Sequence, residues 1–359
     1  MIKKIKIGKH LVGNGLPPFI IAEMSGNHGG SLKRALKIVD SVAKAGAHAV
    51  KLQTYTADTI TLKSNRREFV INDKKSIWYG RNLYDLYDQA HTPWEWHEEI
   101  FKRAKQNNLI CFSSPFDETA VDFLEKLKVP AYKIASFEIN HIPLIQKVAL
   151  TGKPIIISTG MASEKEIRVA VKAARDKGAK KIILLKCTSE YPASVKDSNL
   201  VTIPHMIKKF DCPIGLSDHS EGIGAPITAI ALGACMIEKH VTLDKKDGAV
   251  DSKFSIEISE FQSMVKECNN AWQALGKQII GPSKSEIKSK KYRRSIYTIK
   301  SIKKGELISY KNIKVIRPAN GSHPKYFHSL IGKKINKSIG ANMPMKLIYI
   351  DRHEKKSKK

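Results

Sequence analysis

The sequence lacks the features that mark several common protein classes. It has five cysteines in 359 residues and no CxxC pair, so neither a disulfide framework nor a zinc knuckle is indicated. It also has no run of 18 apolar residues and no apolar signal-peptide core near its amino terminus. We therefore expect a soluble cytoplasmic protein whose thiols are mostly buried. These thiols belong to Cys111, Cys187, Cys212, Cys235 and Cys268.

Acidic residues are scarce relative to basic ones. The 34 Asp and Glu face 62 Lys and Arg, which gives a net charge of +28. Such a charge is compatible with nucleic-acid binding, but the basic residues are scattered and no helix-turn-helix, RNP-like or zinc-finger pattern accompanies them. A lysine-rich solvated surface is the simpler interpretation, with a disordered basic tail at 353–359. A positive protein would still attract a small anionic substrate.

Eight short apolar runs recur along the chain. Each is nearly continuous rather than alternating, which is typical of parallel strands covered on both faces. The runs are Phe19–Glu23, Ala49–Gln53, Ile110–Ser114, Ala131–Ile134, Pro154–Ser158, Lys181–Lys186, Pro213–Ser217 and Cys235–His240.

Helical patterns separate most of these runs. One begins at Ser31 as N-cap and stops at Gly46, and another begins with the capping box of Ser163 and Glu166 and stops at Gly178. Two further helical stretches are Glu221–Gly233 and Ser259–Gly276. Repeated strand–helix alternation predicts an α/β fold, a (β/α)₈ TIM barrel of roughly 250 residues, which leaves about 80–100 for an appended module. A doubly wound sheet is the alternative, disfavoured because no GxGxxG follows a strand.

Polar side chains stand at or just after the end of every run. They are Glu23, Gln53, Ser114, Lys133 with Ser136, Ser158, Lys186, Ser217 with His219, and Glu238 with His240. In a barrel all these ends converge on the carboxyl-terminal mouth, where barrel active sites lie. The segment 54–93 is too long for an ordinary loop and carries several aromatic residues, and long loops of this kind are often functional lids, although the sequence does not reveal the role of this one.

The polar ends contain the groups that an anionic substrate needs. Lys51 and Lys133 lie inside apolar strands, and Lys186 is a third candidate; burying a lysine is costly unless it is paired or binds an anion. The structural alternative is that the lysines extend their ammonium groups to the rim. Nearby hydroxyls and the small Gly160 complete a predicted phosphate and carboxylate cradle. The hydroxyls are those of Ser114, Ser136, Ser158 and Ser217.

Two histidines and four acids complete the predicted site, and the acids are Glu23, Glu138, Asp218 and Asp251. His219 and His240 end neighbouring strands, and two imidazoles plus waters make an open coordination sphere for a divalent metal. Glu23 could deprotonate or orient a substrate, or simply pair with Lys51. Glu138 and Asp251 could bind sugar hydroxyls, although a plain Asx turn also explains Asp251.

These motifs together resemble the sialic acid synthase family over nearly the whole chain. The stretches that carry the resemblance are IAEMSGNHGG, AVKLQTY, CFSSPFD, AYKIASFE, ISTGM, LLKCTSEYP, GLSDHS and EKHVTLD. Within the family, LYDLYDQAHTPWEWH and DSKFS resemble the pseudaminic acid branch. The resemblance implies a barrel domain at 1–276, a linker at 277–293 and an antifreeze-protein-like (SAF) domain at 294–352, the last supported by RSIYTIKSIKKGELIS and VIRPANG.

The resemblance also implies roles for single residues. Those expected around phosphoenolpyruvate are Lys51, Gln53, Ser114, Lys133, Ser136, Ser158, Tyr191 and Ser217. His219 and His240 would hold the divalent ion, with Mn²⁺ or Mg²⁺ expected and Co²⁺ an option. Glu23 would act near the reacting centre, and Glu138 and Asp251 would bind the sugar. Ser189 departs from the N-acetylneuraminate branch, which has Asn there, so contacts at that position do not carry over.

The implied activity is a condensation of phosphoenolpyruvate with an amino-sugar aldehyde. A homodimer with swapped C-terminal domains would bring Arg317 to the partner's substrate, and no nucleic acid or membrane is expected as a partner. N-acetylneuraminate and legionaminic acid synthesis are alternatives within the family. From other classes, a Schiff-base aldolase would use Lys133 or Lys186, and a non-catalytic carbohydrate- or nucleic-acid-binding protein would use the basic surface.

Overall fold

The computed structural model describes residues 4–351. These residues divide after Gly276 into two compact units. The predicted basic tail at 353–359 lies outside the described residues. Within residues 4–351, no helix has the length and apolar character needed to span a membrane. All five cysteines are buried, as predicted.

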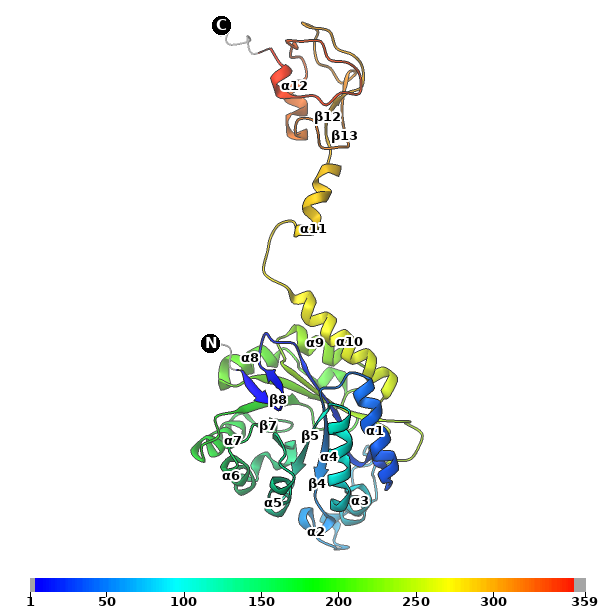
Figure 1. The fold of residues 1–359 in the computed structure, drawn as a ribbon, viewed down its shortest axis with the longest axis vertical. Helices are drawn as coiled ribbons and strands as arrows, with labels where there is room; N and C mark the ends of the chain where they lie inside the picture. The colour runs from blue at the N-terminus through cyan, green and yellow to red at the C-terminus, as the bar shows by residue number, and fades with distance from the viewer. Residues whose placement is uncertain (1–3, 352–359) are drawn as a thin grey trace. The chain divides into compact units, whose positions relative to one another are not determined.

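The first unit is a closed barrel of eight parallel strands (Figure 1). The strands are β3 (Phe19–Glu23), β4 (Ala49–Thr54), β5 (Ile110–Pro115), β6 (Tyr132–Ile134), β7 (Ile155–Ser158), β8 (Ile182–Cys187), β9 (Ile214–Asp218) and β10 (Met236–Thr242). Each pairs with the next along the chain, and β10 closes the ring by pairing with β3. The predicted barrel is confirmed, and the doubly wound alternative is wrong.

Helices cover the outside of the ring. They are α1 (Leu32–Lys44), α4 (His97–Gln106), α5 (Glu118–Lys126), α6 (Ile142–Leu150), α7 (Glu164–Asp176), α8 (Thr202–Phe210), α9 (Gly224–Ala231) and α10 (Ile258–Leu275). The predicted caps are present: Ser31 accepts from the amide of Arg34, and Ser163 and Glu166 form a capping box before α7. Side-chain caps satisfy amides that a helix start leaves unpaired, so these helices begin where their sequences predict.

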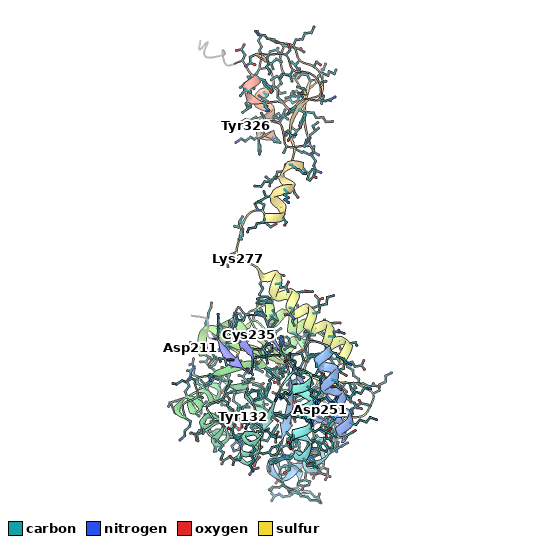
Figure 2. The ribbon with its side chains drawn as sticks, viewed as in Figure 1. Tyr132, Asp211, Cys235, Asp251, Lys277 and Tyr326 are labelled. Carbon is teal, nitrogen blue, oxygen red and sulfur yellow. The ribbon has the colours of Figure 1, made fainter. Side chains whose placement is uncertain are left out.

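Strand alternation produces two apolar layers. Ile20 and Val50 face outward and pack under the helices, whereas Phe19, Ile21 and Phe112 face the barrel interior. The antiparallel strands β1 (Ile5–Ile7) and β2 (His10–Val12) add apolar side chains to the interior layer. Tyr132, fully buried, is one of the residues that Figure 2 labels within this unit. The lower barrel is therefore filled with apolar side chains, which leaves polar chemistry for the strand ends.

Shorter elements complete this unit. The two-residue strand β11 (Ile256–Glu257) pairs in parallel with the end of β10. The segment 54–93 contains two α-helices, α2 (Ala57–Ile60) and α3 (Leu83–Ala90), and a short 3-10 helix, Arg67–Phe69. It is therefore partly ordered into helix rather than being a plain loop.

The second unit is a small module with its own core. Its elements are α11 (Lys284–Ile287), β12 (Ser295–Thr298), β13 (Ile313–Ile316) and α12 (Phe327–Leu330). The strands β12 and β13 pair antiparallel, with Ser295 opposite Ile316. The core contains Ile296, Ile302, Ile308, Ile313, Leu330, Ile335, Ile339, Met345 and Ile350. Because this core is separate, the module can pack as an independent domain.

Candidate active site at the barrel mouth

The alternation of each strand decides which polar side chains enter the barrel. On β4, Ala49 faces the interior and Val50 and Leu52 pack outward, so Lys51 and Gln53 share the inward face. The same period-two rule turns further polar groups inward near the carboxyl ends. They are Glu23, Ser114, Lys133, Ser158, Ser217, Glu238 and His240.

Two lysines and two glutamates form a buried charged cluster. The Lys51 ammonium contacts the Glu23 carboxylate and lies 4.0 Å from Oε2 of Glu238, while Nζ of Lys133 lies 3.4 Å from Oε1 of Glu238. Lys51 and Lys133 are only 3% and 2% exposed, so they do not reach the rim. Buried charges are costly unless they are paired. The cluster therefore holds two ammonium groups inside the barrel, as the sequence predicts.

The charges in this cluster shift one another's pKa values. Burial lowers the pKa of Lys133. For Lys51, burial acts in the same direction, but the carboxylates of Glu23 and Glu238 outweigh it and raise the pKa. Burial opposes ionisation of Glu238, yet Lys133 and Lys51 hold its pKa below the ordinary value. Burial raises the pKa of Glu23, which makes this carboxyl the one most easily protonated in the cluster.

Hydroxyl groups surround the cluster. The Ser114 hydroxyl accepts from Nζ of Lys51 at 3.2 Å, and the Ser217 hydroxyl donates to Oε1 of Glu238 at 3.0 Å. The Ser158 hydroxyl is buried and has no hydrogen-bond partner within the described residues. Such a hydroxyl is free to bind a ligand. A side chain at position 160 would clash with Ser136, because its Cβ would lie only 2.6 Å from Cβ of Ser136. Glycine at this position therefore leaves room for the serine side chain.

The two histidines lie next to each other. The ring centroids of His219 and His240 are 5.3 Å apart. The Nδ1 atom of His219 lies 2.8 Å from the carbonyl oxygen of Thr188, which leaves its Nε2 available, and Nδ1 of His240 is buried without a partner within the described residues. Burial lowers the pKa of His240 far below its usual value, so the ring is neutral. Burial also lowers the pKa of His219, but Cys187 and the Thr188 carbonyl outweigh it and raise the value. An imidazole held by a carbonyl through one nitrogen is oriented to bind a metal ion through the other.

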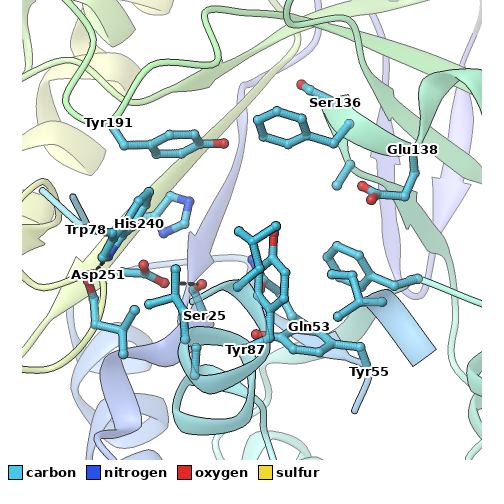
Figure 3. Close-up of a pocket in the computed structure, with 18 of the residues that line it drawn as sticks. Ser25, Gln53, Tyr55, Trp78, Tyr87, Ser136, Glu138, Tyr191, His240 and Asp251 are labelled. Atoms are coloured by element: carbon cyan, nitrogen blue, oxygen red, sulfur yellow. Dashed lines mark hydrogen bonds between the residues drawn. The ribbon is translucent and has the colours of Figure 1, made fainter. Parts of the chain in front are cut away.

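Above the cluster is a cavity of about 410 Å³ (Figure 3). Predicted site residues on its lining are Gln53, Ser136, Glu138, Tyr191, His240 and Asp251. Burial raises the pKa of Glu138 to about 7. Asp251 accepts from the Ser25 hydroxyl and from the amide of Gly26, the latter at 3.1 Å. This volume is in the range of small-molecule sites, and its polar groups converge as in such sites.

Comparison with known proteins agrees with the geometry. The model of the NeuB family matches residues 38–280, and that of the SAF domain matches residues 293–345. This chain belongs to the NeuB family. The predicted resemblance to sialic acid synthases and the predicted SAF module are thereby confirmed.

Several NeuB-family relatives cover most of the chain. The pseudaminic acid synthase of Campylobacter jejuni is 46% identical and covers 89% of this chain and 93% of its own length. That of Helicobacter pylori is 43% identical and covers 94% and 98%. Among solved structures, the N-acetylneuraminic acid (sialic acid) synthetase of Leptospira borgpetersenii has a TM-score of 0.72 and 34% identity, with 80% of this chain and 95% of that chain covered.

Three predicted residues lie outside the charged cluster of this NeuB-family barrel. Lys186 follows Leu185 on β8 and faces outward, and its ammonium donates to the carbonyl of Cys187 and the hydroxyl of Thr188. Ser189 lies at the rim, 3.8 Å from Sγ of Cys187. Arg317 is exposed in the second unit, directly after β13.

Sequence reasoning missed several residues at this site. The sequence predicts Glu238 only as a polar strand end, yet its carboxylate lies within 4.0 Å of both Lys51 and Lys133. Cys187 lies 3.8 Å from Nδ1 of His219, and this histidine lowers the thiol pKa to about 7 against the opposing effect of burial. Ser25 fixes Asp251. Side chains alternate between the two faces of a strand, so Glu238, two residues before His240, could have been placed on the same inward face. No sequence signal identifies Ser25, because its partner Asp251 is far away along the chain.

Proposed function

We propose that this chain makes pseudaminic acid. The reaction joins phosphoenolpyruvate, the open-chain aldehyde of 2,4-diacetamido-2,4,6-trideoxy-L-altropyranose and water, and releases phosphate by C–O cleavage. The observation that carries the proposal is that two buried lysines and two histidines lie at the carboxyl-terminal end of the same barrel. The identity of 43–46% to two curated pseudaminic acid synthases supports the choice of sugar.

Phosphoenolpyruvate supplies the anion that the buried lysines need. Its phosphate and carboxylate would lie against Lys51 and Lys133, with hydroxyls such as the unpartnered Ser158 donating to their oxygens. A low-dielectric site strengthens these contacts, because there is little water to screen them. Gln53, Ser114, Ser136 and Ser217 complete the proposed cradle. Fixed donors of this kind can contribute several kcal/mol to the stability of a developing charge.

His219 and His240 are proposed to hold a divalent metal ion, with Mn²⁺ or Mg²⁺ expected and Co²⁺ an option. The buried, unpartnered Nδ1 of His240 supports a ligand there, and the hydrogen bond of His219 to the Thr188 carbonyl fixes a ligating tautomer. Residues 4–351 contain no group of three or more His, Cys, Asp or Glu suited to a metal. The proposed site therefore has two protein ligands and open positions for water and substrate. When bound, such an ion is a Lewis acid toward the aldehyde oxygen.

The chain's own residues would organise the bond changes. The cradle orients C3 of phosphoenolpyruvate toward the aldehyde carbon, where the new C–C bond forms. Water then adds at C2 of the former phosphoenolpyruvate unit, and ionised Glu23, whose pKa burial raises, accepts a proton from this water. That proton is then available to the former aldehyde oxygen, which becomes a hydroxyl. The resulting tetrahedral carbon loses phosphate as its C–O bond breaks, with Lys51 and Lys133 binding the departing anion, and the C2 hydroxyl proton leaves with the phosphate as the C2 ketone forms. Holding both reactants in this orientation lowers the entropic cost of the reaction.

Glu138 and Asp251 are proposed to bind the sugar. Both carboxylates face the cavity, and both are buried enough that their pKa values are raised. Tyr191 lines the same cavity, where its ring lies 4.4 Å from that of His219. Ser189 remains a proposed contact at the rim. Hydrogen bonds to buried groups of this kind discriminate strongly between sugars, because a missing partner leaves them unpaired.

We further propose a homodimer in which the second unit of one protomer serves the barrel of its partner. The Arg317 side chain is exposed, and its loop is held by the Ser295 hydroxyl, which donates to Pro318 O at 2.6 Å and accepts from Gly321 N at 2.9 Å. A Cβ at Gly321 would lie 2.1 Å from the carbonyl oxygen of Ile296, so only glycine fits. This loop therefore presents an accessible guanidinium suited to an anionic ligand group. The expected cytoplasmic location stays a prediction.

The deciding experiment gives the purified full chain phosphoenolpyruvate, Mn²⁺ and one of three sugars. These are N-acetylmannosamine, the pseudaminic acid precursor and the legionaminic acid precursor. Phosphate release should be fastest by far with the pseudaminic precursor. A clear preference for another sugar would instead assign the N-acetylneuraminate or the legionaminic reaction; the N,N'-diacetyllegionaminic acid synthase of Campylobacter jejuni is 36% identical to this chain.

The Schiff-base alternative has a separate test. The lowered pKa of Lys133 is a property that amine nucleophiles share. Borohydride should trap no covalent adduct when the sugar aldehyde or pyruvate is present, and EDTA should stop turnover. An adduct on Lys133 or Lys186 that forms regardless of chelator would overturn the proposed condensation.

A further inference from the structure

The loop 243–255, which follows β10, brings Asp251 to the cavity from a stretch without helix or strand. Loops are ordinarily more mobile than the elements they join, so a side chain on a loop needs other contacts to fix its direction. Asp251 is nevertheless only 7% exposed. Its carboxylate must therefore be held in place by residues from the rest of the barrel.

Asp251 is hydrogen-bonded at both its side chain and its backbone. The carboxylate accepts from the Ser25 hydroxyl and from the amide of Gly26, and the backbone carbonyl accepts from the Ser255 hydroxyl at 2.7 Å. The Ser255 hydroxyl in turn accepts from Nδ2 of Asn27 at 2.8 Å. A carboxylate held at both points has little freedom to turn away from the cavity.

The side chain of Asn27 connects this loop to the barrel. Its Nδ2 also donates to the carbonyl of Val241, near the end of β10, at 2.8 Å. A side-chain amide nitrogen has two hydrogens, and these two bonds use both of them. Neither Asn27 nor Ser255 is among the described residues that line the cavity. They can therefore affect a bound ligand only through residues that do line it.

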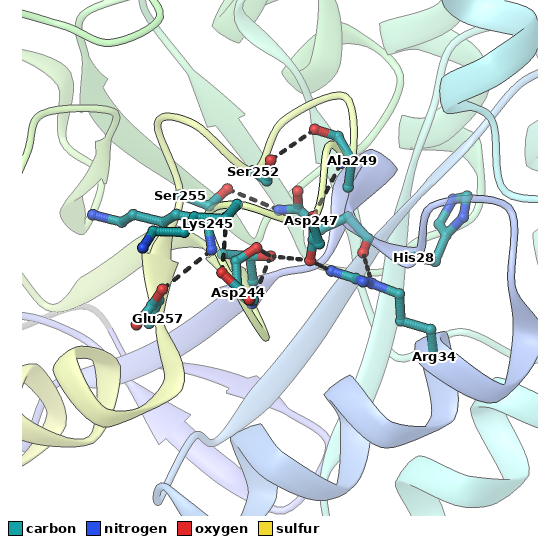
Figure 4. Close-up of polar contacts among 12 residues, drawn as sticks. His28, Arg34, Asp244, Lys245, Asp247, Ala249, Ser252, Ser255 and Glu257 are labelled. Atoms are coloured by element: carbon teal, nitrogen blue, oxygen red, sulfur yellow. Dashed lines mark hydrogen bonds and ion pairs between the residues drawn. The ribbon is translucent and has the colours of Figure 1, made fainter.

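An ion pair on the outer side anchors the first half of the loop (Figure 4). Asp247 pairs with the guanidinium of Arg34 and accepts from the amide of Ala249 at 3.0 Å. Nε of the same arginine donates to the carbonyl of Asn27 at 2.7 Å. Arg34, which lies on α1, therefore holds both the loop and the residue that bonds to Ser255.

The inner contacts come from one buried turn, Ser25–His28. Ser25 has a left-handed backbone with φ 46°, a conformation that is unfavourable for residues other than glycine. Glycine would adopt it freely but could not donate a side-chain hydrogen bond to Asp251. Nε2 of His28 lies 3.3 Å from the Thr92 hydroxyl, so the turn is also held on its other side. A strained residue in a turn held on both sides indicates a functional task.

We infer that this turn positions the Asp251 carboxylate for the sugar, and that Asn27 and Ser255 are positioning residues that act through it. The inference rests on the proposed function, in which Asp251 binds the sugar. It gives a role to the segment SGNHGG, which the proposed reaction does not use. A carboxylate that is fixed before the sugar arrives loses little freedom on binding, so its hydrogen bonds contribute more to affinity.

The test is a double-mutant cycle with the full chain, phosphoenolpyruvate, Mn²⁺ and the pseudaminic acid precursor. The measured quantity is kcat/KM for the sugar, from phosphate release. Ser255→Ala should lower it about threefold to tenfold, because one hydrogen bond to Asp251 is lost. In an Asp251→Ala background the same change should lower it by less than about twofold, because the group that Ser255 positions is gone. Binding of phosphoenolpyruvate and of Mn²⁺, measured by calorimetry, should not change.

Ser252→Ala is the matched control. Ser252 belongs to the same loop and is also fully buried, but its hydroxyl donates to the carbonyl of Ala249, at 2.9 Å, and not to Asp251. This variant should leave the sugar kcat/KM unchanged in both backgrounds. Ser25→Gly is a second test variant, because glycine keeps the left-handed turn and removes only the hydroxyl. Its effect should likewise depend on the presence of Asp251.

Three results would overturn the inference while leaving the proposed reaction intact. They are no change in the sugar kcat/KM for either test variant, equal losses with and without the Asp251 carboxylate, and a parallel loss of phosphoenolpyruvate and Mn²⁺ binding. The last two would show that the turn only stabilises the fold. No phosphate release by the wild type with any of the three sugars would overturn the proposed function itself.

Discussion

At the scale of single residues, Glu138 carries a pH-dependent charge into the sugar site. Burial raises its pKa to about 7, so the carboxyl gains a proton as the pH falls through neutrality. The ionised form accepts hydrogen bonds from sugar hydroxyls with both oxygens, and the protonated form loses part of that capacity. We expect the KM for the sugar to rise several-fold between about pH 8 and pH 6.

Steady-state kinetics over that range would measure this effect. In Glu138→Gln the sugar KM should be high and nearly independent of pH, because no charge changes at that position. If the variant kept the wild-type pH profile, the titrating group would have to be another residue.

The two neighbouring imidazoles are proposed to act together. Loss of either His219 or His240 leaves one protein ligand, so each alanine variant should retain less than about a tenth of wild-type activity. Binding of Mn²⁺ followed by electron paramagnetic resonance, without substrates, should weaken in parallel. Dialysis against EDTA should likewise silence the wild type until a divalent ion is returned.

His205→Ala provides the control for this pair, because His205 is exposed on α8. It should bind Mn²⁺ and turn over like the wild type. Full activity of His219→Ala or His240→Ala after EDTA treatment would count against a metal site formed by these residues.

Residue patterns predict part of the candidate site but not all of it. Lys51 and Lys133 were identifiable because a lysine within an apolar strand needs an anionic partner. The partner itself, Glu238, was not identified, since its contacts depend on how three strands align across the barrel. Lys186 is a case in which the sequence predicts a site residue that does not join the cluster. Its neighbour Leu185 points into the barrel, so Lys186 points outward from β8. Both cases depend on which residues of a strand point into the barrel, and a continuous apolar run does not reveal this.

At the scale of secondary-structure elements, β9 and β10 are joined by an ion pair on their outward side. The Lys239 ammonium contacts Oδ2 of Asp218 at 2.5 Å and donates to the carbonyl of Ser220 at 2.6 Å, and both charged side chains are under 5% exposed. Asp218 and Lys239 each precede a histidine of the proposed metal pair. Lys239→Met would leave the aspartate buried without its partner, which typically costs about 3–5 kcal/mol.

Denaturant unfolding followed by tryptophan fluorescence would measure this loss. The four tryptophans, Trp78, Trp94, Trp96 and Trp272, all belong to the first unit and report on its unfolding alone. Lys172→Met is the matched control, because its ion pair with Asp176 is exposed and should contribute less than about 1 kcal/mol. Replacing both members, as Lys239→Met with Asp218→Leu, should recover much of the stability. A loss no larger than that of the control would show that the pair is not stabilising.

The strands of the barrel were predictable to within one or two residues, and the structure of segment 54–93 was not. The barrel strands are buried on both faces and form apolar runs, while caps such as Ser31 and Ser163 mark helix starts. The helix α3 has only eight residues and begins at Leu83, after its cap Asn82, in a stretch whose sequence predicts a loop. Its stability depends on packing over the cavity rather than on local propensity, and short helices of that kind are poorly encoded in sequence.

At the scale of the whole molecule, the fold class follows from repetition. Eight strand–helix alternations leave few arrangements other than a closed parallel barrel. The separate second unit is equally predictable from its length and motifs. Oligomeric state is different, because it depends on surfaces that a single sequence pattern does not reveal.

The proposed domain swap predicts complementation between inactive variants. Arg317→Ala should lower activity by at least about a hundredfold, because a bidentate guanidinium contact to an anion is lost. Its barrel should remain intact, as should the second unit of a Lys133→Ala variant. In mixed dimers, one site can combine an intact barrel with an intact Arg317 only if the two come from different protomers. Co-refolded or co-expressed mixtures should therefore regain up to about a quarter of wild-type activity, as random pairing allows.

Arg317→Lys should stay poorly active, since the lysine ammonium lacks the planar, two-pronged donor geometry of a guanidinium. Mixtures that remain as inactive as their components would argue that each second unit serves its own barrel or none.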